Sequence, residues 1–186
     1  GVNVFVSILG GFVVIVLGCM AAVIWIRLEN EHMRRINEKM NATKDLDGYV
    51  EKMEKIGKRT ILAMIYHQSI LNRSTGYINL GEYKKALEVM DELQKYKVNT
   101  EVRFLEVWNR LFALIELRNY GQAQKLMKKY QTLLAAYEKA SEPIADRMEL
   151  YRYLAAGDNE MALEKVRYCR EKNTDASAND QLDYYE

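Results

Sequence analysis

The chain has 186 residues, and its 27 Lys and Arg nearly balance its 26 Asp and Glu, for a formal net charge of +1. This balance lacks the basic excess on which nucleic-acid binding depends, so we expect no nucleic-acid partner. A single Pro, nine Met and many Leu, Ala, Glu and Lys favour helices. No stretch alternates β-branched and polar residues between turn signals, so the composition predicts an all-α protein.

The first 26 residues carry no charged side chain, and the run ends at Trp25 and Ile26, just before Arg27. A helix of this length extends about 39 Å, more than the ~30 Å of a hydrocarbon core. Trp and Arg at its end suit the membrane interface. The sequence therefore predicts a transmembrane helix over residues 1–27, with 2–26 in the bilayer. A cleaved signal peptide or a buried core helix are the alternatives, but a signal peptide has a basic start and a shorter apolar region.

The basic residues near this run all follow it: Arg27, Arg34, Arg35 and Lys39. Positive charge gathers on the cytoplasmic side of membrane helices, and acidic residues count little in this rule. We expect a single-pass membrane protein whose remaining chain is cytoplasmic.

Residues 28–57 form a highly charged juxtamembrane segment. Leu28 to Met40 extends the preceding helix, residues 41–48 mark a break, and a second helix covers about 49–56. One interpretation is a stalk or short coiled coil; the other is a solvated helical connector whose apolar residues cover the first repeat. Fewer than three heptads are present, which favours the connector.

Residues 58–186 contain a short pattern three times. Gly-Glu-Tyr-Lys-Lys-Ala at 81–86 aligns with Arg-Asn-Tyr-Gly-Gln-Ala at 118–123 and with Gly-Asp-Asn-Glu-Met-Ala at 157–162. The final residues, Ala86, Ala123 and Ala162, are separated by 37 and 39 positions. Each pattern follows an apolar segment of helix length. It resembles the tetratricopeptide repeat, in which a helix, a tight turn and a second helix recur every 34 residues. We assign the extra residues to turns near 98–100 and 139–141.

The resemblance implies a short solenoid of helical hairpins wound as a right-handed superhelix. Its repeats would cover about 67–100, 104–137 and 143–176, followed by a partial helix. The residues expected to pack the repeats together are Gly81, Tyr83, Ala86, Tyr120, Ala123, Gly157 and Ala162. In this family the first helices line a concave groove that binds a protein or peptide partner. By the family's register, the groove residues here are Leu71, Ile78, Asn79, Trp108, Phe112, Arg147 and Tyr151, and Thr75 and Ile144 also face the groove. The expected anchors for the partner are Trp108, Phe112 and Tyr151.

The chain also departs from the family pattern. Arg73, Arg110 and Glu149 stand where the family usually has Leu, and the closing Pro of each repeat is missing. An irregular helical bundle is the alternative fold. Some members of the family bind the terminal carboxylate of a partner through a pattern of Lys and Asn residues. Leu71 and Thr75 stand at two of those positions here, which argues against a terminal carboxylate as the ligand.

No pattern in the sequence points to catalysis. The chain lacks a glycine-rich phosphate loop and a nucleophile motif, and His32 and His67 have no partner at metal-ligand spacing. We therefore expect no enzyme activity, metal or cofactor. The sequence favours a membrane-tethered adaptor that binds a partner through the groove. The alternatives are a structural homo-oligomeric membrane protein and the regulatory region of a larger enzyme.

Overall fold

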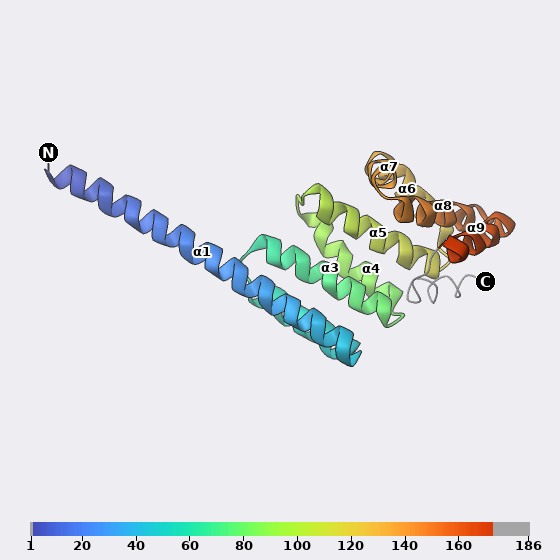
Figure 1. Cartoon of the computed structure of the whole chain (residues 1–186), viewed down its shortest axis with the longest axis horizontal. Helices are drawn as coiled ribbons and strands as arrows, with labels where there is room; N and C mark the ends of the chain where they lie inside the picture. The colour runs from blue at the N-terminus through green and yellow to red at the C-terminus, as the bar shows by residue number, and fades with distance from the viewer. Residues whose placement is uncertain (1, 173–186) are drawn as a thin grey trace. The chain divides into compact units, whose positions relative to one another are not determined.

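The structure is a computed structural model that describes the backbone of residues 2–172 and the side chains of residues 16–40 and 42–172. This part of the chain is entirely helical, as the composition predicted, and contains no strand. Figure 1 shows the arrangement of the helices. In chain order they are α1 Val2–Thr43, α2 Leu46–Arg59, α3 Ala63–Asn79, α4 Tyr83–Asp91, the 3-10 helix η1 Glu92–Lys95, α5 Thr100–Glu116, α6 Tyr120–Lys129, α7 Gln131–Ala140, α8 Glu142–Ala156 and α9 Asn159–Lys172.

Two predicted segments extend beyond the described residues. The partial helix expected after residue 176 lies outside them. Most of the predicted transmembrane stretch, residues 1–15, lies outside those whose side chains are described. Within the described residues, no helix is both long enough and apolar enough to span a bilayer. The transmembrane helix therefore stays a prediction.

The chain divides into two compact units, Gly1–Asn72 and Arg73–Glu186. The division falls inside α3, whereas the sequence placed the start of the repeat region at residue 58. The beginning of α3 belongs to the first unit because it packs closely on α2. A methyl group added at Gly57 would lie only 2.6 Å from the Ser69 hydroxyl oxygen.

The first unit has a core of its own, built by a helical hairpin of α1 and α2. Lys44 takes a left-handed conformation (φ 57°) at the turn, and the Asp45 carboxylate caps α2 by accepting the Gly48 N–H at 3.0 Å. The apolar residues of the predicted connector face each other across this hairpin. The core consists of Met33, Ile36, Tyr49, Met53, Ile56 and Ile65. The apolar residues of segment 28–57 therefore pack against one another and against Ile65 at the start of α3.

The second unit contains the end of α3 with α4 and two whole helical hairpins, α5–α6 and α8–α9, and the turns of all three hairpins have the same geometry. One residue with positive φ follows within two positions of the end of each first helix: Gly81 (73°), Arg118 (53°) and Gly157 (76°). Its N–H donates to the carbonyl three residues back, and the next N–H donates to the carbonyl five residues back, at distances of 2.8–3.1 Å. This is the Schellman arrangement that ends a helix.

Each turn leads to a buried alanine five residues after its left-handed residue. The N–H of each alanine donates to the carbonyl of the residue four positions earlier, at 3.0–3.1 Å, which starts the second helix at the same register each time. Ala86, Ala123 and Ala162 are all buried, while Tyr83 and Tyr120 are half-buried beside them. A methyl side chain at this position lets two helices approach closely.

The chain between successive hairpins has a different structure in each case. Between the first two hairpins lies a non-helical stretch, 96–99, and the Asn99 side chain caps α5 by accepting the Val102 N–H at 2.8 Å. After the second hairpin the chain forms an additional helix, α7, and the break expected near 139–141 follows it at the extended residue Ser141, between α7 and α8. This helix packs against α8.

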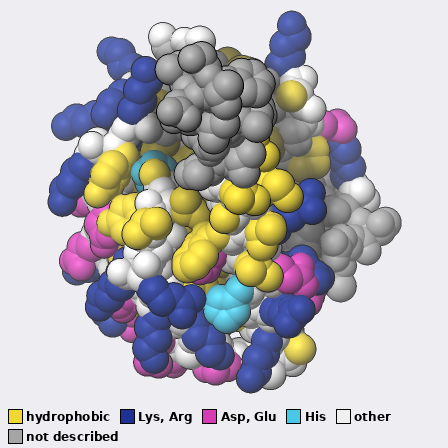
Figure 2. Space-filling model, turned by 90° about the vertical axis from the view of Figure 1, so that its left-hand side faces the viewer, with side chains coloured by type: hydrophobic (Ala, Val, Ile, Leu, Met, Phe, Trp, Pro, Cys, Tyr) yellow, Lys and Arg dark blue, Asp and Glu magenta, His cyan; other side chains and the backbone are white. Residues whose placement is uncertain are grey.

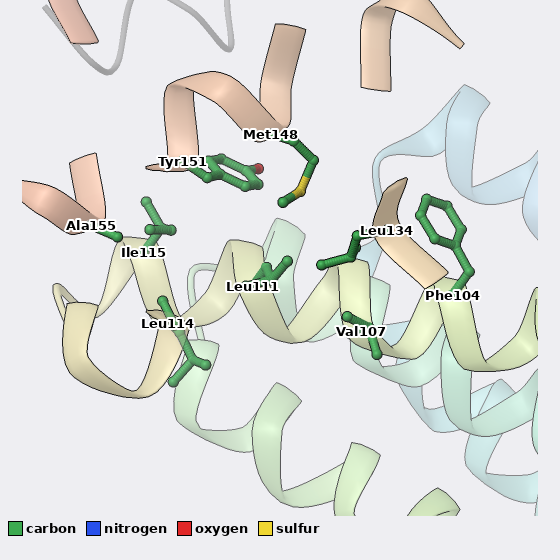
Figure 3. Close-up of a cluster of buried hydrophobic side chains, with 10 residues drawn as sticks. Phe104, Val107, Leu111, Leu114, Ile115, Leu134, Met148, Tyr151 and Ala155 are labelled. Carbon is green, nitrogen blue, oxygen red and sulfur yellow. The ribbon is translucent and has the colours of Figure 1, made fainter. Parts of the chain in front are cut away.

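Helix α5 lies at the centre of the second unit and packs against α4, α6, α7 and α8. Leu111 on α5 and Met148 and Tyr151 on α8 meet in one apolar cluster (Figure 3). Leu134 of α7 closes the same cluster. At the start of α5 the ring of Phe104 stacks on Tyr137 of α7 with 3.6 Å between centroids.

The shared turn predicts opposite effects of two substitutions. A side chain at φ near +60° costs roughly 1 kcal/mol, and a Cβ at Gly157 would meet no atom within 4 Å, so the cost is purely conformational. We expect Gly157→Ala to lower the free energy of unfolding by about 1 kcal/mol. Arg118→Gly should raise it, by less, because Gly also gains freedom in the unfolded chain. Urea unfolding followed by circular dichroism measures both changes, and a neutral Gly157→Ala would contradict the turn geometry.

Candidate functional site

A pocket of about 300 Å³ opens on the second unit where three first helices meet. Its lining comes from the end of α3, the middle of α5 and the first half of α8. The lining residues are Thr75, Ile78, Asn79, Trp108, Asn109, Phe112, Pro143, Ile144, Arg147 and Tyr151. We refer to this set as the groove.

Aromatic rings form one wall of the groove and are held by their neighbours. Trp108 lies 5.9 Å from Tyr151 and 5.7 Å from Phe104, centroid to centroid. Phe112 meets Tyr83 of α4 edge to face at 6.2 Å. Tyr151 is fully buried, whereas Trp108 and Phe112 are half-buried and reach the pocket surface. The wall is therefore an extension of the core with two partly open rings.

Polar groups border the aromatic wall. The Asn109 side-chain amide donates to the hydroxyl oxygens of Ser74 at 3.0 Å and Thr75 at 3.2 Å, which ties α5 to α3 beside the pocket. Ser74 is buried, so this hydrogen bond satisfies a group that water does not reach. Asn79 is exposed and Arg147 is half-buried on the α8 side. The groove thus combines amide and hydroxyl groups with one guanidinium.

The structure brings most of the predicted groove residues together. Ile78, Asn79, Trp108, Phe112, Arg147 and Tyr151 all line the pocket. Leu71 does not: it is buried, and it belongs to the first unit. The family register had placed it on the groove, but its part of α3 packs into the other core.

Two groove residues were missed by the sequence prediction, Asn109 and Pro143. Asn109 directly follows Trp108, one of the predicted anchors. Pro143 stands in the first turn of α8, where a missing N–H costs nothing. Both are next to predicted groove residues in the sequence. The helical spacing of apolar residues did not distinguish these two positions from positions that face solvent.

A second pocket of about 490 Å³ lies over α4, α5 and α6 and includes Arg110, Lys125 and Lys129. Its most buried cation already has acidic partners. Arg110 lies 2.9 Å from both Glu106 and Asp91, and Arg103 also pairs with the buried Glu106. The Arg110–Asp91 contact joins α5 to α4, and the two Glu106 pairs lie within α5, so this pocket is part of the scaffold.

An ion-pair network joins α8, which carries Arg147 and Tyr151, to α9. Lys165 lies 2.8 Å from Asp146 and 2.6 Å from Glu149. Partial burial opposes ionisation of Asp146, but the hydrogen bond and charge of Lys165, with the charge of Lys172, hold its pKa below the usual value. The hydrogen bond from Lys165, and a second from Tyr153, also lower the pKa of Glu149.

No metal or redox chemistry is evident in the described residues. They contain no group of three or more His, Cys, Asp or Glu side chains placed to hold a metal ion. Cys19 and Cys169 are both free thiols, and burial raises the pKa of Cys169.

Comparison with known proteins gives no match. No family model matches the chain, and neither a curated protein nor a solved structure does. The groove and its residues are therefore the basis on which a function can be assigned.

The network between α8 and α9 predicts a pH dependence of stability. Asp146 and Glu149 have lowered pKa values in the folded chain, so their contribution is present above the unfolded values of 3.8 and 4.5 and is lost as the pH falls through the folded values. Lys165→Met should therefore destabilise the chain at pH 7 more than at pH 3.

The matched control is Lys55→Met, which breaks the exposed pair with Glu51 on α2. Such surface pairs contribute little, so this variant should change little at either pH. Thermal unfolding at the two pH values measures the difference. An effect of Lys165→Met that is equal at pH 3 and pH 7 would contradict the assigned network.

Proposed function

We propose that this chain is a membrane-tethered adaptor of the tetratricopeptide type, which recruits a protein partner through the groove. The observation that carries the proposal is the convergence of Ile78, Trp108, Phe112 and Arg147 from three different helices on one pocket. Aromatic and arginine side chains in partly open pockets are the residues that dominate binding energy at protein interfaces.

The repeated turn supports the assignment to tetratricopeptide repeats. Three hairpins end their first helices with the same pair of hydrogen bonds and place a buried alanine at the same step of the second helix. Repeat proteins of this kind bind partners on an extended surface made by equivalent helices. The groove is formed by the equivalent first helices α3, α5 and α8.

The chemistry of the groove indicates what the partner presents. Its volume, about 300 Å³, is at the lower end of the range of ~300–1,000 Å³ for ligand pockets. It therefore suits one or two side chains of a peptide. An apolar side chain fits against Trp108 and Phe112, and a neighbouring carboxylate suits the Arg147 guanidinium. Asn79 supplies amide groups for the peptide backbone.

The proposed anchor is the uncharged N-terminal run. The backbone of α1 continues as one helix from Val2 to Thr43, through the whole run. Its described part leaves Leu17, Met20 and Ile24 more than half exposed to the surroundings. An exposed apolar helix of this kind suits lipid. The basic residues that follow it favour a cytoplasmic position for the repeats.

Site-specific photo-crosslinking in cells tests the groove. A photoreactive amino acid at the exposed position Asn79 should give an adduct with a partner, and Arg147→Glu should reduce the yield because it reverses the charge beside the probe. Arg152→Glu is the matched control, since Arg152 lies on the same helix, pairs with Glu138 and does not line the groove. Mass spectrometry of the adduct identifies the partner.

Two outcomes would contradict the adaptor proposal. The first is an adduct that forms equally when the probe is moved to Lys128, an exposed position on α6 outside the groove. The second is adducts formed only with another copy of the chain, which would favour the structural homo-oligomer. Circular dichroism of the Arg147→Glu and Arg152→Glu variants checks that both remain helical.

A further inference from the structure

An isoleucine is almost fully exposed in the first unit. Ile61, in the segment between α2 and α3, has 91% of its surface open, whereas the next residue, Leu62, packs on the core of the hairpin. The segment is held by defined hydrogen bonds. Thr60 donates its N–H to Ile56 O at 2.9 Å, and its hydroxyl oxygen accepts the Leu62 N–H at 3.2 Å. Ile61 is therefore presented outward by an ordered turn.

This turn lies level with the end of the uncharged run of α1. Helix α2 returns along α1, so that Ile56 shares a core with Met33 and Arg59 lies 3.7 Å from Glu29. Glu29 is three residues beyond Ile26, the last residue of the run, a rise of about 5 Å along the helix. If residues 2–26 cross a bilayer, the turn is at its surface.

The side chains at this end of the first unit have the composition of a membrane interface. Trp25, Leu28 and Met64 are 50%, 64% and 56% exposed. Together with Ile61 they give four open apolar side chains at the end of the run, and the face that Figure 2 presents shows hydrophobic side chains with Lys, Arg, Asp and Glu around them. Aromatic and aliphatic residues next to basic ones suit the headgroup region.

Cations stand at the edge of this surface. The basic groups here are Arg27, Lys58 and Arg59; Glu54 pairs with Lys58, and Glu29 lies beside Arg59. The remaining excess is one positive charge, so apolar contact contributes more than attraction to anionic lipid. An open pocket of about 460 Å³ lined by Trp25, Leu28, Glu29, His32 and Arg59 lies beside the end of the run.

We propose that the turn between α2 and α3 is a second membrane contact, in which Ile61 and Met64 enter the boundary between headgroups and acyl chains of the bilayer that residues 2–26 span. This rests on the membrane anchor of the proposed function. With two contacts, the hairpin of α1 and α2 has a fixed tilt at the membrane surface, whereas a single helix leaves the following unit free to rotate. The partner is the lipid bilayer itself.

Depth-dependent quenching tests this contact in the full chain. Cys19→Ala and Cys169→Ala remove the two thiols, and single cysteines are then introduced by Ile61→Cys, Met20→Cys or Asp47→Cys. Each is labelled with an environment-sensitive fluorophore, and the chain is placed in nanodiscs of phosphatidylcholine and phosphatidylglycerol. Met20 reports on the anchor, and Asp47, exposed at the other end of the hairpin, is the matched control for position 61.

We expect blue-shifted emission and strong quenching by spin-labelled lipid at positions 20 and 61, and neither at position 47. Quenching at 20 without quenching at 61 would overturn the second contact and leave the anchor standing. No quenching at either position would overturn the anchor, and the second contact with it. Equal quenching at positions 47 and 61 would also contradict the second membrane contact.

A second variant separates insertion from mere proximity. With the fluorophore at Met64→Cys, Ile61→Asp should abolish quenching at position 64, because a carboxylate in the turn opposes insertion. Position 20 should be quenched as before. Ile61 makes few contacts within the fold, so the variant should remain folded, and circular dichroism checks this. Undiminished quenching at position 64 would show that Ile61 does not hold the turn in lipid.

Discussion

The second unit depends on one backbone constraint that recurs three times, a left-handed residue in the turn that follows the first helix of a hairpin. Gly81, Arg118 and Gly157 each direct two consecutive N–H groups back to the carbonyls of the helix just completed. Because the turn has the same geometry each time, the second helix begins at the same register and its alanine meets the first helix. Arg118 takes this conformation without the freedom of glycine, so the surrounding contacts must outweigh a cost of roughly 1 kcal/mol.

The groove follows from this repetition together with the central position of α5. Packing on α4, α6, α7 and α8 fixes α5 from several sides, and its remaining face carries Trp108 and Phe112. Tyr151 is buried beneath them and links the aromatic wall to the core. A surface supported in this way is preorganised, so the groove side chains lose less conformational entropy when a partner binds.

Much of the second unit could be predicted because its signals are local: the turn, the alanine and the apolar spacing of α5. Helix α7 was not predicted, since no Gly or Pro marks the break at Tyr130 between it and α6. The core of the first unit was missed because each apolar stripe, such as Met33 with Ile36, is too short to be decisive alone. Leu71 was assigned to the groove by register, but packing of α3 into both units decides its place.

The central claim is that the first helices of the three hairpins form one surface, and contacts between aromatic rings test it most directly. In isotope-labelled chain, nuclear Overhauser effects should connect Trp108 with Tyr151, and Phe112 with Tyr83, whose ring centroids lie 5.9 and 6.2 Å apart. The first pair reports the stacking of α5 on α8, and the second that of α4 on α5. If the backbone chemical shifts show the helices but both ring-to-ring nuclear Overhauser effects are missing, the hairpins do not stack as described and the groove does not exist.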